Sequence, residues 1–85
     1  MRRPFYKYRI HSVGGKFAVS RLTNNEVPQP IIEYLFSVVC NIMQASSYCL
    51  MMRYCIPYKN SNFICIIRHC DSLNEYTIDI TEITY

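Results

Sequence analysis

The sequence of 85 residues has no tryptophan, only two glycines and few charged residues. The two glycines are adjacent, at positions 14 and 15, so the chain lacks the glycine-rich loops that hold phosphates in nucleotide-binding proteins. Charged residues make up 18% and hydrophobic residues 51%, which excludes intrinsic disorder. Barrels and doubly wound sheets need roughly 150–250 residues. The length therefore predicts one small domain over residues 1–85.

The sequence also lacks the features of secreted and membrane proteins. No apolar segment of a signal peptide follows Met1. The five cysteines are an odd number without a C-x-x-C pair, which is not typical of a disulfide framework. Residues 34–52 carry no charge but include several serine, asparagine and glutamine side chains, which makes a poor membrane span. We expect an intracellular protein of the reducing cytoplasm, with no signal peptide and no membrane contact.

Charges of opposite sign gather at the two ends of the sequence. Residues 1–25 contain six bases and no acid: Arg2, Arg3, Lys7, Arg9, Lys16 and Arg21. Residues 71–85 contain four acids and no base: Asp71, Glu75, Asp79 and Glu82. Either the two ends form neighbouring strands or are simply solvated, or the basic end is a surface for an acidic partner or nucleic acid.

The first half of the sequence predicts a hairpin and a helix. A two-residue Gly14-Gly15 turn would place His11 opposite Ala18 and Ile10 opposite Val19. One face of this hairpin is then apolar, and the other is basic. The apolar face carries Tyr6, Tyr8, Ile10, Phe17 and Val19, and the basic face carries Lys7, Arg9, His11 and Lys16. Apolar residues then recur at helical spacing from Pro30 to about residue 45, opposite a polar stripe of Glu33, Ser37, Asn41 and Gln44.

The second half predicts three strands. Residues 48–56 and 62–70 have strand character, with a turn over residues 57–61, and residues 75–85 form the last strand. A change of phase near Thr81 and Glu82 indicates a bulge that turns Ile83 inward. The resulting fold is α+β, ββαβββ: an antiparallel sheet of about five strands with one helix packed on one face. If the helix continued through Ser46 and Ser47 to Arg53, the order would be ββαββ.

Patterns for catalysis and metal binding are weak. On one strand, Cys65 and His69 would lie roughly 13 Å apart, too far for a nucleophile and its base. Cys49, Cys55 and Cys70 have no spacing of the zinc-knuckle type. We therefore expect no enzyme, no metal and no cofactor.

Two surfaces could bind partners. The same turn register places Met52 and Tyr54 toward the helix, and it leaves an apolar face broken by arginines on the other side. We expect this second face to bind a partner protein through Met51, Arg53, Ile64, Ile66 and Arg68. The sequence thus predicts a non-enzymatic interaction module that forms a homodimer, such as the accessory or inhibitor proteins of viruses and mobile elements. The alternative is a nucleic-acid-binding module using Arg2, Arg3, Lys7, Arg9 and Lys16.

Overall fold

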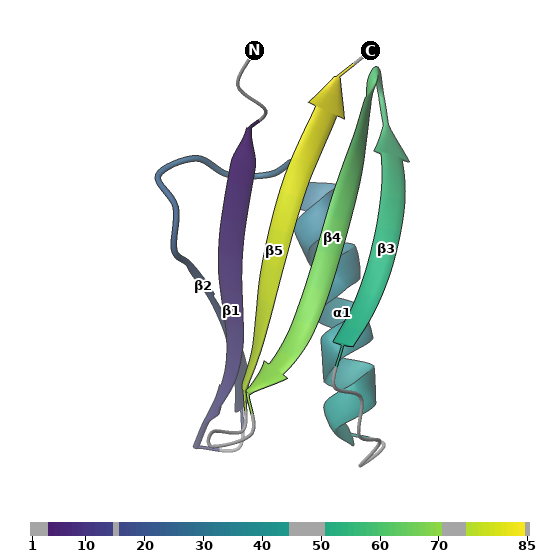
Figure 1. Ribbon diagram of the computed structural model, residues 1–85. Helices are drawn as coiled ribbons and strands as arrows, with labels where there is room; N and C mark the ends of the chain where they lie inside the picture. Colours follow the sequence, from purple (N-terminus) through teal and green to yellow (C-terminus); the bar gives the residue numbers. More distant parts are fainter. Residues whose placement is uncertain (1–3, 15, 45–50, 71–74, 85) are drawn as a thin grey trace.

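The computed structural model describes residues 4–14, 16–44, 51–70 and 75–84, and it contains one sheet and one helix (Figure 1). The elements follow the chain as β1 (Phe5–Val13), β2 (Lys16–Arg21), α1 (Gln29–Gln44), β3 (Met51–Tyr58), β4 (Ser61–Cys70) and β5 (Glu75–Thr84). The predicted ββαβββ order is therefore confirmed. The ββαββ alternative is wrong, because Met51 already begins a strand. Ser46 and Ser47 lie outside the described residues.

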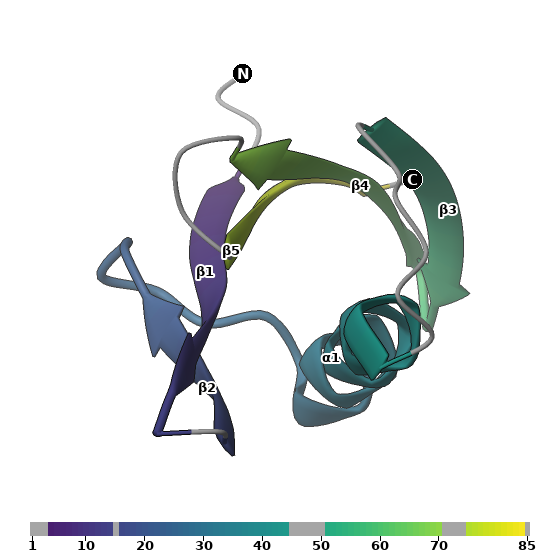
Figure 2. The same ribbon diagram turned by 90° about the horizontal axis from the view of Figure 1, so that it is seen from below.

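The five strands pair antiparallel in the order β2-β1-β5-β4-β3. The sheet curls so that α1 lies on its concave side (Figure 2). We call this side the inner face and the opposite side the outer face. The order makes β1 and β5 neighbours, with Lys7 opposite Asp79 and His11 opposite Glu75. The interpretation of the two charged ends as neighbouring strands is thus confirmed.

Two tight turns set the register of the hairpins. In the first hairpin, His11 lies opposite Ala18 and Ile10 opposite Val19, as the Gly14-Gly15 turn predicts. Gly14 has a φ of 58°, in the left-handed region that glycine adopts at little cost. The second turn is narrower than the predicted 57–61, because Tyr58 pairs with Ser61 and leaves only Lys59 and Asn60 between the strands.

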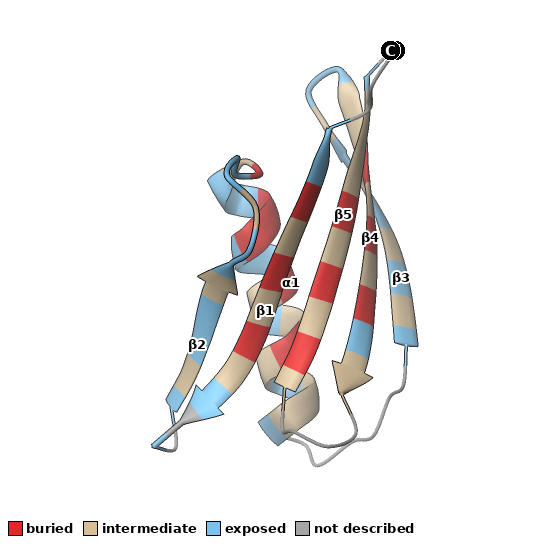
Figure 3. Ribbon diagram, turned by 60° about the vertical axis from the view of Figure 1, so that its left-hand side comes forward, coloured by how far each residue is buried: buried red, intermediate tan, exposed pale blue. Residues whose placement is uncertain are grey.

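The core lies between the inner face and α1 and contains no buried polar or charged residue among those described. Buried and less buried residues alternate along β1, β4 and β5 (Figure 3). The core residues are Tyr6, Tyr8, Ile10, Val27, Ile31, Ile32, Leu35, Val39, Phe63, Cys65, Ile67, Tyr76, Ile78 and Ile80. On α1 the predicted polar stripe, including Ser37 and Asn41, is exposed, so the expected amphipathic helix is confirmed.

The predicted bulge in the last strand is wrong. The pairing of β5 with β4 runs unbroken from Cys70↔Glu75 to Ser61↔Thr84. Glu82 therefore faces inward and Ile83 outward. The carboxylate of Glu82 is stabilised there because it accepts hydrogen bonds from Tyr6 Oη at 2.7 Å and from Ser61 Oγ at 2.9 Å.

The inner face of β2 is less covered than the alternation predicts. Val19 shares the inner face with Ile10, yet 43% of its surface is exposed. The reason is the curl of the sheet, which carries β2 away from α1 (Figure 2).

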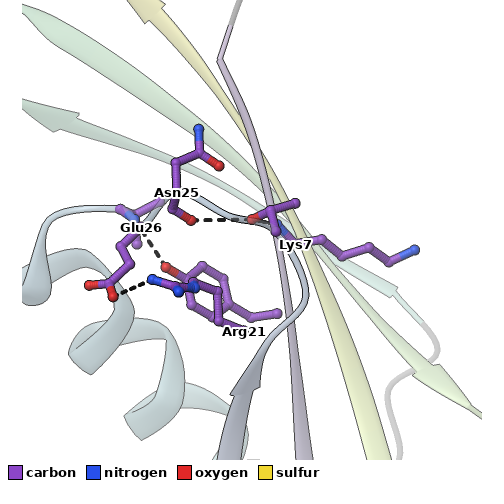
Figure 4. Close-up of polar contacts among 7 residues, drawn as sticks. Lys7, Arg21, Asn25 and Glu26 are labelled. Carbon is purple, nitrogen blue, oxygen red and sulfur yellow. Dashed lines mark hydrogen bonds and ion pairs between the residues drawn. The ribbon is translucent and has the colours of Figure 1, made fainter.

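Hydrogen bonds attach the connector between β2 and α1 to the neighbouring strand β1 (Figure 4). The amide of Val27 donates to Tyr8 Oη at 3.0 Å, and the amide of Lys7 donates to Thr23 Oγ1 at 3.3 Å. An ion pair joins Arg21 to Glu26. These contacts fix the place where the chain leaves the sheet and enters α1.

Ile78 is fully buried at the centre of the sheet, between Tyr8 of β1 and Ile67 of β4. We expect Ile78→Ala to lower the free energy of unfolding by about 2–5 kcal/mol, because it leaves a cavity in the core. Thr77→Ala, on the outer face of the same strand, should cost only about 0.5 kcal/mol. Urea denaturation followed by circular dichroism measures both, and equal losses would contradict the assignment of the two faces.

Candidate functional site: the outer face of the sheet

The outer face carries an apolar row that crosses four strands. Cross-strand partners bring Phe5, Thr81, Ile64 and Cys55 side by side, from β1 through β5 and β4 to β3. Ile83, Asn62 and Pro57 form the next row, toward the Lys59–Asn60 turn of the β3–β4 hairpin. Phe5 is 48% exposed, whereas Ile64 is half-buried by its neighbours. We call the row from Phe5 to Cys55 the apolar row.

Two cationic rows follow in the other direction along the strands. The first contains Lys7, Asp79, Ile66 and Arg53, and the second contains Arg9, Thr77, Arg68 and Met51. Together they hold four bases and one acid. Since the strand order places β1 and β3 on either side of β5 and β4, bases from both halves of the sequence share this part of the face. The outer face is therefore apolar at one end and cationic at the other.

The five residues predicted to bind a partner protein all lie on this face. Ile64 belongs to the apolar row, while Arg53, Ile66, Arg68 and Met51 belong to the cationic rows. Met51 is 60% exposed, and both arginines are exposed. Their predicted grouping on the side away from the helix agrees with the register, because Met52 and Tyr54, their neighbours in sequence, pack against the core.

The residues predicted to bind nucleic acid are only partly brought together. Lys7 and Arg9 lie in the cationic rows, and Lys16 is exposed at the start of β2. Arg2 and Arg3 lie outside the described residues. Asp79 stands directly opposite Lys7, and such opposite-charge pairs across strands lower the positive potential of the face.

Phe5, Pro57 and Ile83 are outer-face residues that the sequence interpretation did not assign to the site. Phe5 could have been assigned to this face from the sequence, because strand alternation puts it on the side of Lys7. Ile83 was missed because the supposed bulge turned it inward.

Thiol and metal chemistry gain no support from the described residues. Burial raises the pKa of the Cys65 thiol to about 12, whereas a nucleophilic cysteine needs a lowered pKa. In the ranges that the structure describes, no three histidine, cysteine or acidic side chains are grouped as metal ligands. Cys49, one of the candidate zinc ligands, lies outside those ranges. No helix within them has the length and hydropathy needed to cross a membrane.

Comparisons of the chain with protein-family models, with curated proteins and with solved structures found no match. The function is therefore argued from the outer face itself.

Cys55 on the outer face and Cys65 on the inner face allow a test of which side chains point outward and which point inward. Cys55 is exposed, whereas Cys65 is buried and must wait for an opening of the core. We expect a thiol reagent to label Cys55 at least about a hundredfold faster than Cys65, measured by mass spectrometry of peptides from monomeric protein. Equal rates would contradict the inner position of Cys65.

Proposed function

We propose that this chain is a non-enzymatic protein-interaction module that binds a second protein chain through the apolar row of its outer face. The partner proposed first is a second copy of the same chain. The observation that carries the proposal is the apolar row from Phe5 to Cys55, on the face that α1 does not cover. An antiparallel sheet with one covered face normally presents polar side chains on the other.

Exposure of such a row to water is unfavourable in free energy. Each Å² of apolar surface removed from water contributes roughly 25 cal/mol, so covering the row favours association. Contiguous apolar patches on small proteins therefore mark interfaces. Cys55 adds a soft, adaptable contact to the row.

A two-fold arrangement can bury this row without bringing like charges together. A two-fold axis that lies in the interface and crosses the strands at Ile64 sets the apolar rows of two copies against each other. The cationic rows with Arg53 and Arg68 then extend to opposite sides of the axis. A second copy can therefore cover the apolar row without setting the two sets of cationic rows against each other.

The size and composition are typical of accessory or inhibitory proteins that viruses and mobile elements encode. In that role the covered apolar row would supply the contact with the partner, and the cationic rows would steer an acidic surface toward it.

Light scattering on a size-exclusion column tests the self-association. We expect a mass near twice 10.1 kDa for the unchanged protein. Ile64→Asp and Ile66→Asp should each give a mass near 10.1 kDa, because a buried carboxylate in the interface is strongly unfavourable. Ser37→Asp is the matched control, since it adds the same charge to the exposed stripe of α1.

Circular dichroism establishes that each variant is folded. The proposed interface is wrong if folded Ile64→Asp protein keeps the mass of the unchanged protein. A monomeric unchanged protein at all concentrations overturns self-association, and capture of the Ser37→Asp protein but not Ile64→Asp by a purified candidate partner would assign the row to that partner.

A nucleic-acid-binding module is the second candidate. The observation that favours it is the position of Arg9 and Arg68. They come from distant parts of the chain and flank Thr77 on either side. Phosphate contacts would come from these residues together with Lys7, Lys16, Arg2 and Arg3.

Fluorescence anisotropy with labelled single-stranded RNA measures this activity. If the second candidate is right, binding weakens steeply with salt, because phosphate contacts release counterions. The double variant Arg9→Glu, Arg68→Glu should then bind at least about tenfold more weakly, while Glu33→Lys on α1 changes little. No RNA binding at about 50 mM salt removes this candidate.

A further inference from the structure

A second candidate site lies on the inner face, beside the start of α1. The strands β3, β4 and β5 extend beyond this end of the helix (Figure 1). They leave a hollow of about 490 Å³ that opens to solvent. The lining residues on which the argument depends are Tyr6, Tyr58, Lys59, Ser61, Phe63 and Glu82. Lys59 belongs to the β3–β4 turn, and the other lining residues lie away from the outer face.

A carboxylate without a cationic partner lies in the wall of the hollow. Glu82 accepts hydrogen bonds from Tyr6 Oη, Ser61 Oγ and, at 3.4 Å, Thr84 Oγ1. Hydroxyl groups fix the position of a carboxylate but leave its charge uncompensated. Among the described residues the one ion pair joins Arg21 to Glu26, so Glu82 has none. The hollow therefore offers a positioned negative charge.

Three aromatic rings line the hollow beside Val27 and Pro28. The ring centroids of Tyr6 and Phe63 lie 6.4 Å apart, and those of Tyr58 and Phe63 also lie 6.4 Å apart. Tyr6 and Phe63 are buried and form the floor of the hollow, whereas the partly exposed Tyr58 offers a ring face and Glu82 offers the counter-charge that a desolvated cation needs. The chain itself shows this preference, because Lys59 Nζ lies 5.5 Å from the centroid of the Tyr58 ring.

An anion is the less suitable ligand, although a helix begins here. The amides of Ile31 and Ile32 both donate to the carbonyl of Pro28, at 3.0 and 3.4 Å. Pro30 has no amide hydrogen. Three positions of the first turn are thus unable to offer N–H groups to an anion, and the carboxylate of Glu82 would repel one.

We propose that this hollow binds an alkylammonium group, held between the face of the Tyr58 ring and the Glu82 carboxylate, above a floor of Tyr6 and Phe63. The group could belong to a free amine or to a lysine side chain, which share the same charge and shape. The site is independent of the apolar row, so either can fail without the other.

Choline is the first probe, and its neutral isostere 3,3-dimethylbutan-1-ol is the control ligand. A titration followed by NMR should give a choline dissociation constant on the order of 1 mM, with shifts at Tyr58 and Ser61. The isostere should bind at least about threefold more weakly, because it lacks the charge. Titrations with n-butylamine and with Nα-acetyl-lysine methylamide, both primary ammonium ions at neutral pH, then distinguish the free amine from the side chain as the preferred source.

Three variants make the test specific. Glu82→Gln should weaken choline binding by about threefold or more, whereas Glu33→Gln removes the same charge from exposed α1 and should have no effect. Lys59→Asn should strengthen binding, because it removes the competing ammonium from Tyr58. Asparagine also tolerates the positive φ of 54° at position 59, so the turn is retained.

Equal binding of choline and its isostere overturns the proposal. So does folded Glu82→Gln protein that binds choline as the unchanged protein does. The gain expected for Lys59→Asn cannot arise from loss of folding, which keeps the test decisive if Glu82→Gln proves unstable.

Discussion

The pairing of β1 with β5 is the constraint on which the rest of the structure depends. It joins residues more than sixty positions apart, from Phe5↔Thr81 to His11↔Glu75, and it connects the N-terminal hairpin to the three C-terminal strands. Tyr8 and Ile78 meet across it in the centre of the core. The same pairing sets Lys7 beside Asp79, which lets the opposite charges of the two ends lie together on one face.

The outer and inner faces owe their different chemistry to this register. On the outer face, alignment of four strands brings isolated residues such as Phe5 and Ile64 into one row, with Thr81 between them. On the inner face, alignment at the same end of the sheet brings Tyr6 to Glu82 and Phe63. Both candidate sites therefore arise from contacts between segments distant in the sequence, and each draws on the first and the last strands.

Local features could be predicted from the sequence, because they depend on neighbouring residues. The Gly14-Gly15 turn, the alternation along β4 and the helix after Pro30 are of this kind. The strand order could not be predicted, since no local pattern specifies which strands pair. The inward position of Glu82 depends on the hydroxyl of Tyr6, 76 positions away, so the hydropathy pattern, which changes phase at Ile83, indicated a bulge instead. The exposure of Val19 depends on the curl of the whole sheet.

The position of β5 has a consequence for how the chain is made. β5 lies inside the sheet, between β1 and β4, yet it is synthesised after the other four strands. Until it leaves the ribosome, β1 and β4 each lack a partner on one edge, and their apolar side chains have no complete core to enter. Closing this non-local pairing is slow compared with forming a hairpin. The nascent chain therefore passes through a stage with two open sheet edges, where association with other chains competes with folding.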